Sequence, residues 1–242
     1  LVREMAGEGQ KRIMNPSTNA DRYATLPARA LNFGVYATDM VYASNFKITS
    51  EVVRYYLVCK RLGEQLGLTT AFSDAEYLRL EHNLAHGDSL EVLSNAAYSR
   101  AYEKMQAEDM GPTLTLVLAG GWVESMHLVM AQILKFDPAD PLVVRVAEQK
   151  ASLDHLVELM DQYKNDPTVA PLRPRFQALQ NIYDQLSVQR APHQGASPSG
   201  RMVLGDDVTI TLTSDKYTEL NTALEELRAN IVRGEDKPET NS

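Results

Sequence analysis

Two acidic residues, Asp39 and Glu124, are the side chains of this sequence best suited to chemistry, because each interrupts a long apolar stretch. Asp39 is the only charged residue between Arg29 and Lys47, and Glu124 lies in the middle of the apolar run 113–134. A carboxylate in such surroundings must be paired with a cation, hydrogen-bonded or protonated. Both acids are therefore candidate binding residues, and a structural ion pair is the alternative interpretation for each.

Aromatic residues accompany both acids. Tyr36 and Tyr42 each lie three residues from Asp39, a spacing that places them beside it on the surface of a helix. Helices over 28–45 and 113–134 that pack together could enclose a small polar pocket. The residues predicted to form this pocket are Asp39, Tyr36, Trp122 and Glu124, and a satisfied hydrogen-bond network between the two helices is the alternative.

Two histidine spacings resemble metal-binding patterns, but neither is complete. Glu124 and His127 have the Glu-x-x-His spacing of di-iron bundles, which also require a second such pair and two further glutamates. His82 and His86 have the spacing of a zinc site on a helix, but no third ligand is evident. We therefore predict no metal site and no cofactor.

Catalytic signatures are equally weak. The sequence has no Gly-x-Ser-x-Gly turn and no glycine-rich phosphate loop. We assign no catalytic residue, and a non-enzymatic protein is favoured over an enzyme.

Composition indicates a folded protein and excludes one class of partner. The chain has 242 residues, of which 44% are hydrophobic and 23% are charged, as in globular domains. Its formal net charge is -8, and it has no run of Lys and Arg that could neutralise phosphates, so we expect no nucleic-acid partner. The single cysteine, Cys59, excludes an intrachain disulfide and is expected to be a buried apolar residue.

Capping residues and chain breakers predict about eight helices. Glycines at 67, 87 and 234 are expected to end three of them, and Pro27 is expected to begin the first. The first five expected ranges are 28–45, 50–66, 73–87, 89–107 and 113–134. The sixth helix is expected to follow the proline corner at 137–141 and to reach 164, and the last two ranges are 172–188 and 215–233. Alternating residues at 202–204 and 208–212 predict a small β-hairpin near residues 201–212.

These elements predict an all-α fold, an irregular antiparallel bundle with that small hairpin. We expect an extended N-terminal arm over 1–25, a single helical domain over 26–234 and a disordered tail over 235–242. The run 113–134 is long enough to cross a bilayer, but Glu124 and His127 would be costly in lipid. We therefore predict a core helix and no transmembrane span, with Gly120 and Gly121 allowing a neighbouring backbone to approach.

Three segments of the chain resemble a group of uncharacterised all-helical lipoproteins of Gram-negative bacterial cell envelopes. The segments are 31–39 (LNFGVYATD), 119–124 (AGGWVE) and, less closely, 227–231 (LRANI). With the helices between them, the resemblance covers roughly residues 28–233. It implies an all-helical fold and an exported protein, periplasmic or associated with the outer membrane. A lipid anchor, if there is one, is expected to precede Leu1.

Taken with the missing catalytic motifs, these observations favour a non-enzymatic protein of the cell envelope. We expect it to bind a protein partner or to act as an accessory or scaffold subunit of a larger assembly. The alternative is a small-molecule-binding protein, or an enzyme without a recognised motif, with its pocket between the helices over 28–45 and 113–134.

Overall fold

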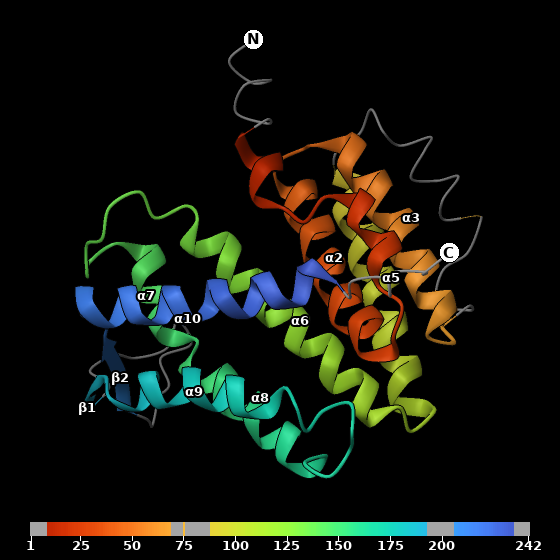
Figure 1. Ribbon diagram of the computed structural model, residues 1–242. Helices are drawn as coiled ribbons and strands as arrows, with labels where there is room; N and C mark the ends of the chain where they lie inside the picture. The colour runs from red at the N-terminus through yellow and green to blue at the C-terminus, as the bar shows by residue number, and fades with distance from the viewer. Residues whose placement is uncertain (1–8, 69–74, 76–87, 193–205, 235–242) are drawn as a thin grey trace, which may run out of the picture.

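The computed structural model of the chain describes residues 9–68, 75, 88–192 and 206–234. Eight α-helices lie wholly within these residues, together with one 3-10 helix and a two-stranded antiparallel sheet. This confirms the expected all-α bundle with a small hairpin (Figure 1). The elements are η1 (Ser17–Arg22), α2 (Leu26–Asn45), α3 (Thr49–Gln65), α5 (Asp88–Ala107), α6 (Gly111–Met130), α7 (Pro141–Glu148), α8 (Lys150–Gln162), α9 (Arg173–Asp184), β1 (Ser187–Pro192), β2 (Asp206–Thr211) and α10 (Ser214–Arg233).

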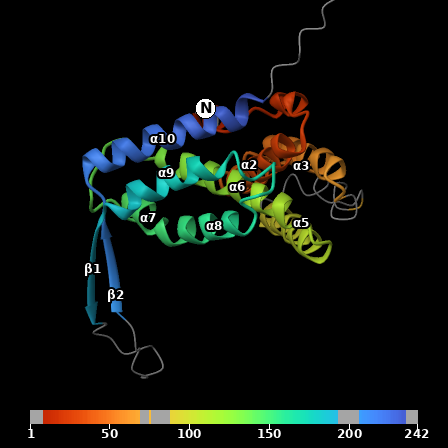
Figure 2. The ribbon, with the colours of Figure 1, turned by 60° about the horizontal axis from the view of Figure 1, so that its bottom comes forward.

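Helix α6 is the centre of the bundle. It contacts α2, α5, α7, α8 and α10, while α3 and α5 also pack against α2. Figure 2 shows α10 on one side of α6 and the strands β1 and β2 projecting away from the helices. The most apolar window of α6 is long enough to cross a membrane, but 72% of it is buried by the rest of the protein. That burial is typical of the core helix of a bundle.

Glycines allow α2 and α6 to pack with their backbones in contact. A Cβ atom added to Gly120 would lie 1.9 Å from the carbonyl oxygen of Leu31, and one added to Gly34 would lie 2.0 Å from that of Val117. Side chains at these positions would therefore force the two helices apart. This close contact fixes how α2 presents Asp39 to α6.

We expect Gly120→Ala to destabilise the protein by about 1–3 kcal/mol or more, because overpacking against a backbone atom cannot be relieved by a side-chain rotation. Gly121→Ala is the matched control, since its Cβ would lie 3.4 Å from the Thr38 hydroxyl and 3.6 Å from the Gly34 carbonyl oxygen, which are ordinary van der Waals distances. Urea unfolding of both variants measures the difference. Equal losses of stability in the two variants would contradict the close contact at Gly120.

Several expected boundaries hold and others need correction. Gly67 and Gly234 have positive φ angles of 84° and 73°, as the expected helix stops require. The expected sixth helix is two helices, α7 and α8, which separate at Gln149, where the backbone N–H bonds to Val146, three residues back. The expected third helix falls almost wholly on residues outside those described, as does the tail 235–242.

The hairpin has a different first strand from the expected one. Strand β2 covers most of the expected 208–212, but it pairs with β1, with Ser187 opposite Thr211 and Pro192 opposite Asp206. The expected seventh helix, which was to reach 188, therefore ends at Asp184. Residues 202–204 lie outside the described part of the chain.

The N-terminal segment, residues 9–23, is folded rather than extended, which corrects that expectation for the described part of the arm. Residues 9–13 are helical and residues 17–22 form η1. Met14, Ala20 and Tyr23 are buried in the core. The reason is that this segment contributes apolar side chains and backbone polar groups to a buried cluster, described below.

Candidate functional site

Asp39 and Glu124 lie together in the protein interior, between α2, α6 and α10, and both are fully buried. The two oxygens of Glu124 each accept a hydrogen bond from Arg228 of α10, from Nε at 2.7 Å and from Nη2 at 2.7 Å. This bidentate geometry is the strongest arrangement that an arginine and a carboxylate can form. Glu124 is therefore held as the anion in a buried ion pair.

A second ion pair lies one helical turn along the same two helices. His127 Nδ1 lies 2.6 Å from Glu225 Oε1, and its Nε2 lies 2.9 Å from the carbonyl oxygen of Ile13. Burial raises the pKa of Glu225, but the hydrogen bond and charge of His127 outweigh this and lower that pKa. We call Asp39, Glu124, His127, Glu225 and Arg228 the charge cluster.

The N-terminal segment closes the charge cluster with backbone groups. The carbonyl oxygen of Ile13 accepts from Arg228 Nη2 at 3.1 Å as well as facing His127. The backbone N–H of Asn15 donates to Asp39 Oδ2 at 3.0 Å. Tyr36 donates to the carbonyl oxygen of Pro16 at 2.9 Å. These contacts bury Asp39 and Glu124 completely, whereas Glu225 at the edge of the cluster is partly exposed.

Asp39 differs from Glu124 because it has no cation of its own. Burial, followed by the charge of Glu124, raises the pKa of Asp39 well above its usual range, and Arg228 offsets only part of this effect. Its Oδ1 atom is buried with no donor directed at it. The surroundings of Asp39 therefore favour its neutral, protonated form.

Trp122 does not join these residues, although the sequence grouped it with them. Trp122 and Glu124 are two residues apart on α6, so their side chains leave the helix in nearly opposite directions. The Trp122 ring packs against Phe176, with 6.1 Å between ring centroids, and lines a cavity on the other side of α6. Asp39, Tyr36 and Glu124 are brought together, and Trp122 is not.

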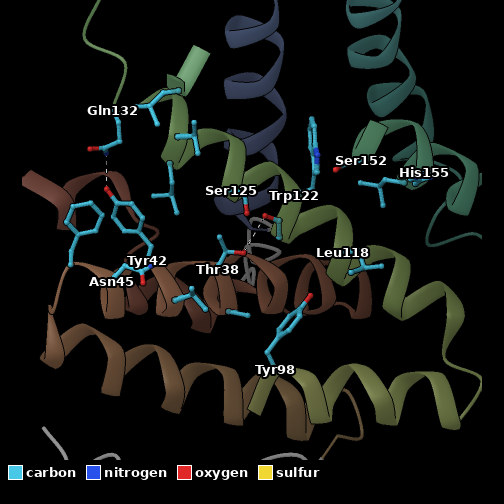
Figure 3. Close-up of a pocket in the computed structure, with 18 of the residues that line it drawn as sticks. Thr38, Tyr42, Asn45, Tyr98, Leu118, Trp122, Ser125, Gln132, Ser152 and His155 are labelled. Atoms are coloured by element: carbon cyan, nitrogen blue, oxygen red, sulfur yellow. Dashed lines mark hydrogen bonds between the residues drawn. The ribbon is translucent and has the colours of Figure 1, made fainter. Parts of the chain in front are cut away.

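This cavity, between α2, α6 and α8, has a volume of about 770 Å³ and is bounded mainly by apolar side chains (Figure 3). Volumes of about 300–1,000 Å³ are usual for small-molecule sites. Tyr98 of α5 and Leu142 of α7 also line it. The other lining residues are Ala37, Thr38, Val41, Tyr42, Asn45, Phe46, Leu118, Gly121, Trp122, Ser125, Leu128, Val129, Gln132, Ser152, His155, Leu156 and Leu159.

The walls of the cavity are held by hydrogen bonds, and its mouth is polar. Gln132 donates to the Tyr42 hydroxyl at 2.9 Å, and Tyr42 in turn donates to Gln10 of the N-terminal segment. The Thr38 hydroxyl donates to the carbonyl oxygen of Gly34 at 3.0 Å. Ser125, Ser152 and His155 are exposed to solvent. The cavity is therefore preformed and accessible from outside.

Metal binding finds no support in the described residues, where no group of three or more His, Cys, Asp or Glu side chains is arranged to hold an ion. Glu124 and His127, the pair with the di-iron spacing, have separate partners on α10. His82 and His86 lie outside the described residues. Cys59 is buried, as expected, and burial raises the pKa of its thiol.

Arg228 and most of the residues that line the cavity were missed from the sequence. Arg228 lies four residues after Leu224 and three before Ile231, so it falls on the buried face of α10, and a charge on that face was the available signal. Most cavity residues are ordinary apolar positions of α2, α6 and α8, which carry no separate signal. Comparison of the chain with family models, characterised proteins and solved structures finds no match.

Proposed function

We propose that this protein is a non-enzymatic binding protein that takes up an apolar small molecule in the cavity between α2, α6 and α8. One observation carries the proposal, which is an accessible cavity of about 770 Å³ with mainly apolar walls. Burial of apolar ligand surface in such a site stabilises a complex by about 25 cal/mol per Å² before the costs of association. The proposal follows the small-molecule alternative drawn from the sequence.

The charge cluster supports a structural role rather than a catalytic one. Asp39 and Glu124 are fully buried, and the polar atoms of the cluster face one another or the backbone of residues 13–15. A catalytic acid or base must reach the proton it transfers in a bound substrate. Asp39 and Glu124 do not line the cavity. The proposal therefore gives them the role of holding α2, α6 and α10 together around it.

A protein partner and a place in the cell envelope are secondary proposals that rest on the resemblance of residues 31–39, 119–124 and 227–231. The exposed large apolar side chains of the described residues belong to different elements and include Phe46, Leu57, Leu134 and Val144. Scattered residues of this kind are normal on soluble proteins. The cavity is therefore better supported as a binding site than a docking face is.

Binding of the uncharged fluorescent probe N-phenyl-1-naphthylamine tests the proposal. We expect probe fluorescence to rise on mixing with the protein and to saturate at one equivalent. Ser152→Phe should weaken binding about tenfold, or ~1.4 kcal/mol, because the new ring occupies the mouth of the cavity.

Ala151→Phe is the matched control for this measurement. Ala151 precedes Ser152 on α8 and is also exposed, but it does not line the cavity. The control should bind the probe as the parent does. A probe that does not bind the parent protein, or that binds Ser152→Phe as tightly as the parent, would contradict the proposed function.

A further inference from the structure

The cavity is elongated along α6. The residues of α6 and of the turn after it that line the cavity are Leu118, Gly121, Trp122, Ser125, Leu128, Val129 and Gln132. Positions 118 and 132 are roughly 21 Å apart at about 1.5 Å per residue. With carbon–carbon bonds of about 1.52 Å, an extended alkyl chain advances about 1.25 Å per carbon, so a chain of up to roughly 16 carbons matches that length.

One end of this elongated cavity is polar. Figure 3 shows Tyr42, Asn45 and Gln132 gathered at one end and Leu118 toward the other. Asn45 is exposed, and its side-chain amide makes no hydrogen bond to the described residues. We call this part of the cavity the Asn45 end. It is open to solvent and can accommodate the polar group of a ligand.

Two lysines flank the Asn45 end. Lys47 comes two residues after Asn45, and Lys135 comes three residues after the lining turn that follows α6. Both are exposed, and neither makes an ion pair with a described residue. The acids that follow Lys135 along the chain, Asp137 and Asp140, accept hydrogen bonds from backbone N–H groups instead. The two lysines therefore make the Asn45 end attractive to an anion.

An anionic head group suits the Asn45 end better than the edge formed by α8. At that edge His155 faces the carboxylate of Glu158 at 3.8 Å, so a negative head group would meet a negative side chain. At the Asn45 end the head group keeps much of its water while it gains from the lysines. The high cost of moving a charge into an apolar site is thereby avoided.

We propose that the cavity binds single-chain amphiphiles with an anionic head group, such as fatty acid anions, with the chain along α6 and the head group at the Asn45 end. This inference rests on the proposed function, since it concerns the same cavity. It adds the chemical class of the ligand and names Lys47 and Lys135 as residues that determine specificity. The apolar walls would supply most of the affinity, and the lysines would supply the preference for an anion.

Two ligands with the same chain and opposite charges test the inference in the parent protein. Decanoate and nonylammonium share a nonyl chain, and each is titrated at neutral pH to displace N-phenyl-1-naphthylamine. Trp122 lines the cavity and is the only tryptophan, so its fluorescence gives a second reading. We expect decanoate to bind about three- to tenfold more tightly, as exposed ion pairs provide, and the preference to shrink at high salt. The net charge of -8 favours the cation overall, so a preference for the anion must be local.

Chain length tests the placement along α6. Octanoate, decanoate and dodecanoate should displace the probe with rising affinity, by up to about fifteenfold for each two carbons, since a buried CH₂ group contributes about 0.8 kcal/mol. An affinity that does not rise with chain length would overturn the inference.

Lys47→Glu and Lys135→Glu should each reduce the preference for decanoate over nonylammonium about two- to fivefold. Lys164→Glu is the matched control, because it makes the same change of charge at an exposed lysine outside the cavity. Lys164 follows Tyr163, which lies against Gly111 at the first residue of α6, far from the Asn45 end.

Three results would overturn the inference while leaving the proposed function intact. They are a parent protein without a preference for the anion, a preference that survives in both cavity-end variants, and an equal loss in the Lys164→Glu control. Failure of the probe and of every amphiphile to bind the parent would overturn both.

Discussion

Glu124→Gln is expected to lower the free energy of unfolding by about 3–5 kcal/mol, because it leaves Arg228 buried without its counter-charge. The guanidinium cannot lose its proton under ordinary conditions, and only 13% of the Arg228 side chain is exposed. Asp39 is a poor substitute, because burial raises its pKa and disfavours its charged form. Urea unfolding, followed by circular dichroism, measures the loss.

The double variant Glu124→Met/Arg228→Met is the control for this prediction. Replacing both members of a buried ion pair by apolar residues often changes the free energy of unfolding little, since no unpaired charge remains and the apolar side chains pack. We expect the double variant to recover most of the stability lost in Glu124→Gln. A double variant as unstable as the single one would show that the loss comes from packing at Glu124 and not from the orphaned arginine.

The burial of the two acids could be predicted because each stands alone in an apolar helix. The proximity of Tyr36 to Asp39 followed in the same way from helical spacing. Helical spacing also argued against the grouping of Trp122 with Glu124, since residues two apart on a helix do not share a face. The error came from treating neighbours in the sequence as neighbours in space.

The closure of the charge cluster had no signal in the sequence. Ile13 and Asn15 take part through a backbone carbonyl and a backbone N–H, groups that every residue except proline carries in full. Their alignment depends on how the N-terminal segment folds over α2 and α10. Such tertiary contacts decide which acid keeps its proton, so the different states of Asp39 and Glu124 could not be read from their similar surroundings in the sequence.

The lack of a local signal for tertiary contacts also explains why some element boundaries were predicted wrongly. Gly67 and Gly234 ended helices as expected because a positive φ angle is a local requirement that glycine meets. No glycine or proline marks the break between α7 and α8 at Gln149, and β1 includes Pro192, a residue that disfavours strands. These features depend on packing against other elements, which local patterns do not encode.

Asp39→Asn is expected to change how stability depends on pH, with the sign opposite to that of a salt-bridged acid. Asp39 titrates near 3.8 when exposed, and burial with the charge of Glu124 raises its pKa well above this in the folded protein. The folded state therefore holds a proton that the unfolded state has released. Stability from this group is present at low pH and is lost as pH rises through the folded pKa.

Asparagine should resemble the protonated form, since its side chain is uncharged and its oxygen can accept from the N–H of Asn15. Other titratable or charged groups act on Asp39 or lie next to it. Both proteins contain these groups, so their contributions to the pH dependence of stability cancel when the two proteins are compared. Among them, the tyrosines and Cys59 have pKa values raised by burial and stay neutral between about pH 5 and about pH 8. These groups are Tyr36, Tyr42, Tyr55, Cys59, Glu124, His127 and Arg228.

Urea unfolding of parent and variant across that interval gives the result directly. The two proteins should differ least at the acid end of that interval, where least of the stability from protonated Asp39 has been lost. As pH rises, the parent should lose stability relative to the variant, since the unfolded parent has released a proton that the folded protein still holds. If the parent instead gains stability relative to Asp39→Asn as pH rises, Asp39 is ionised in the folded protein and the guanidinium serves both acids.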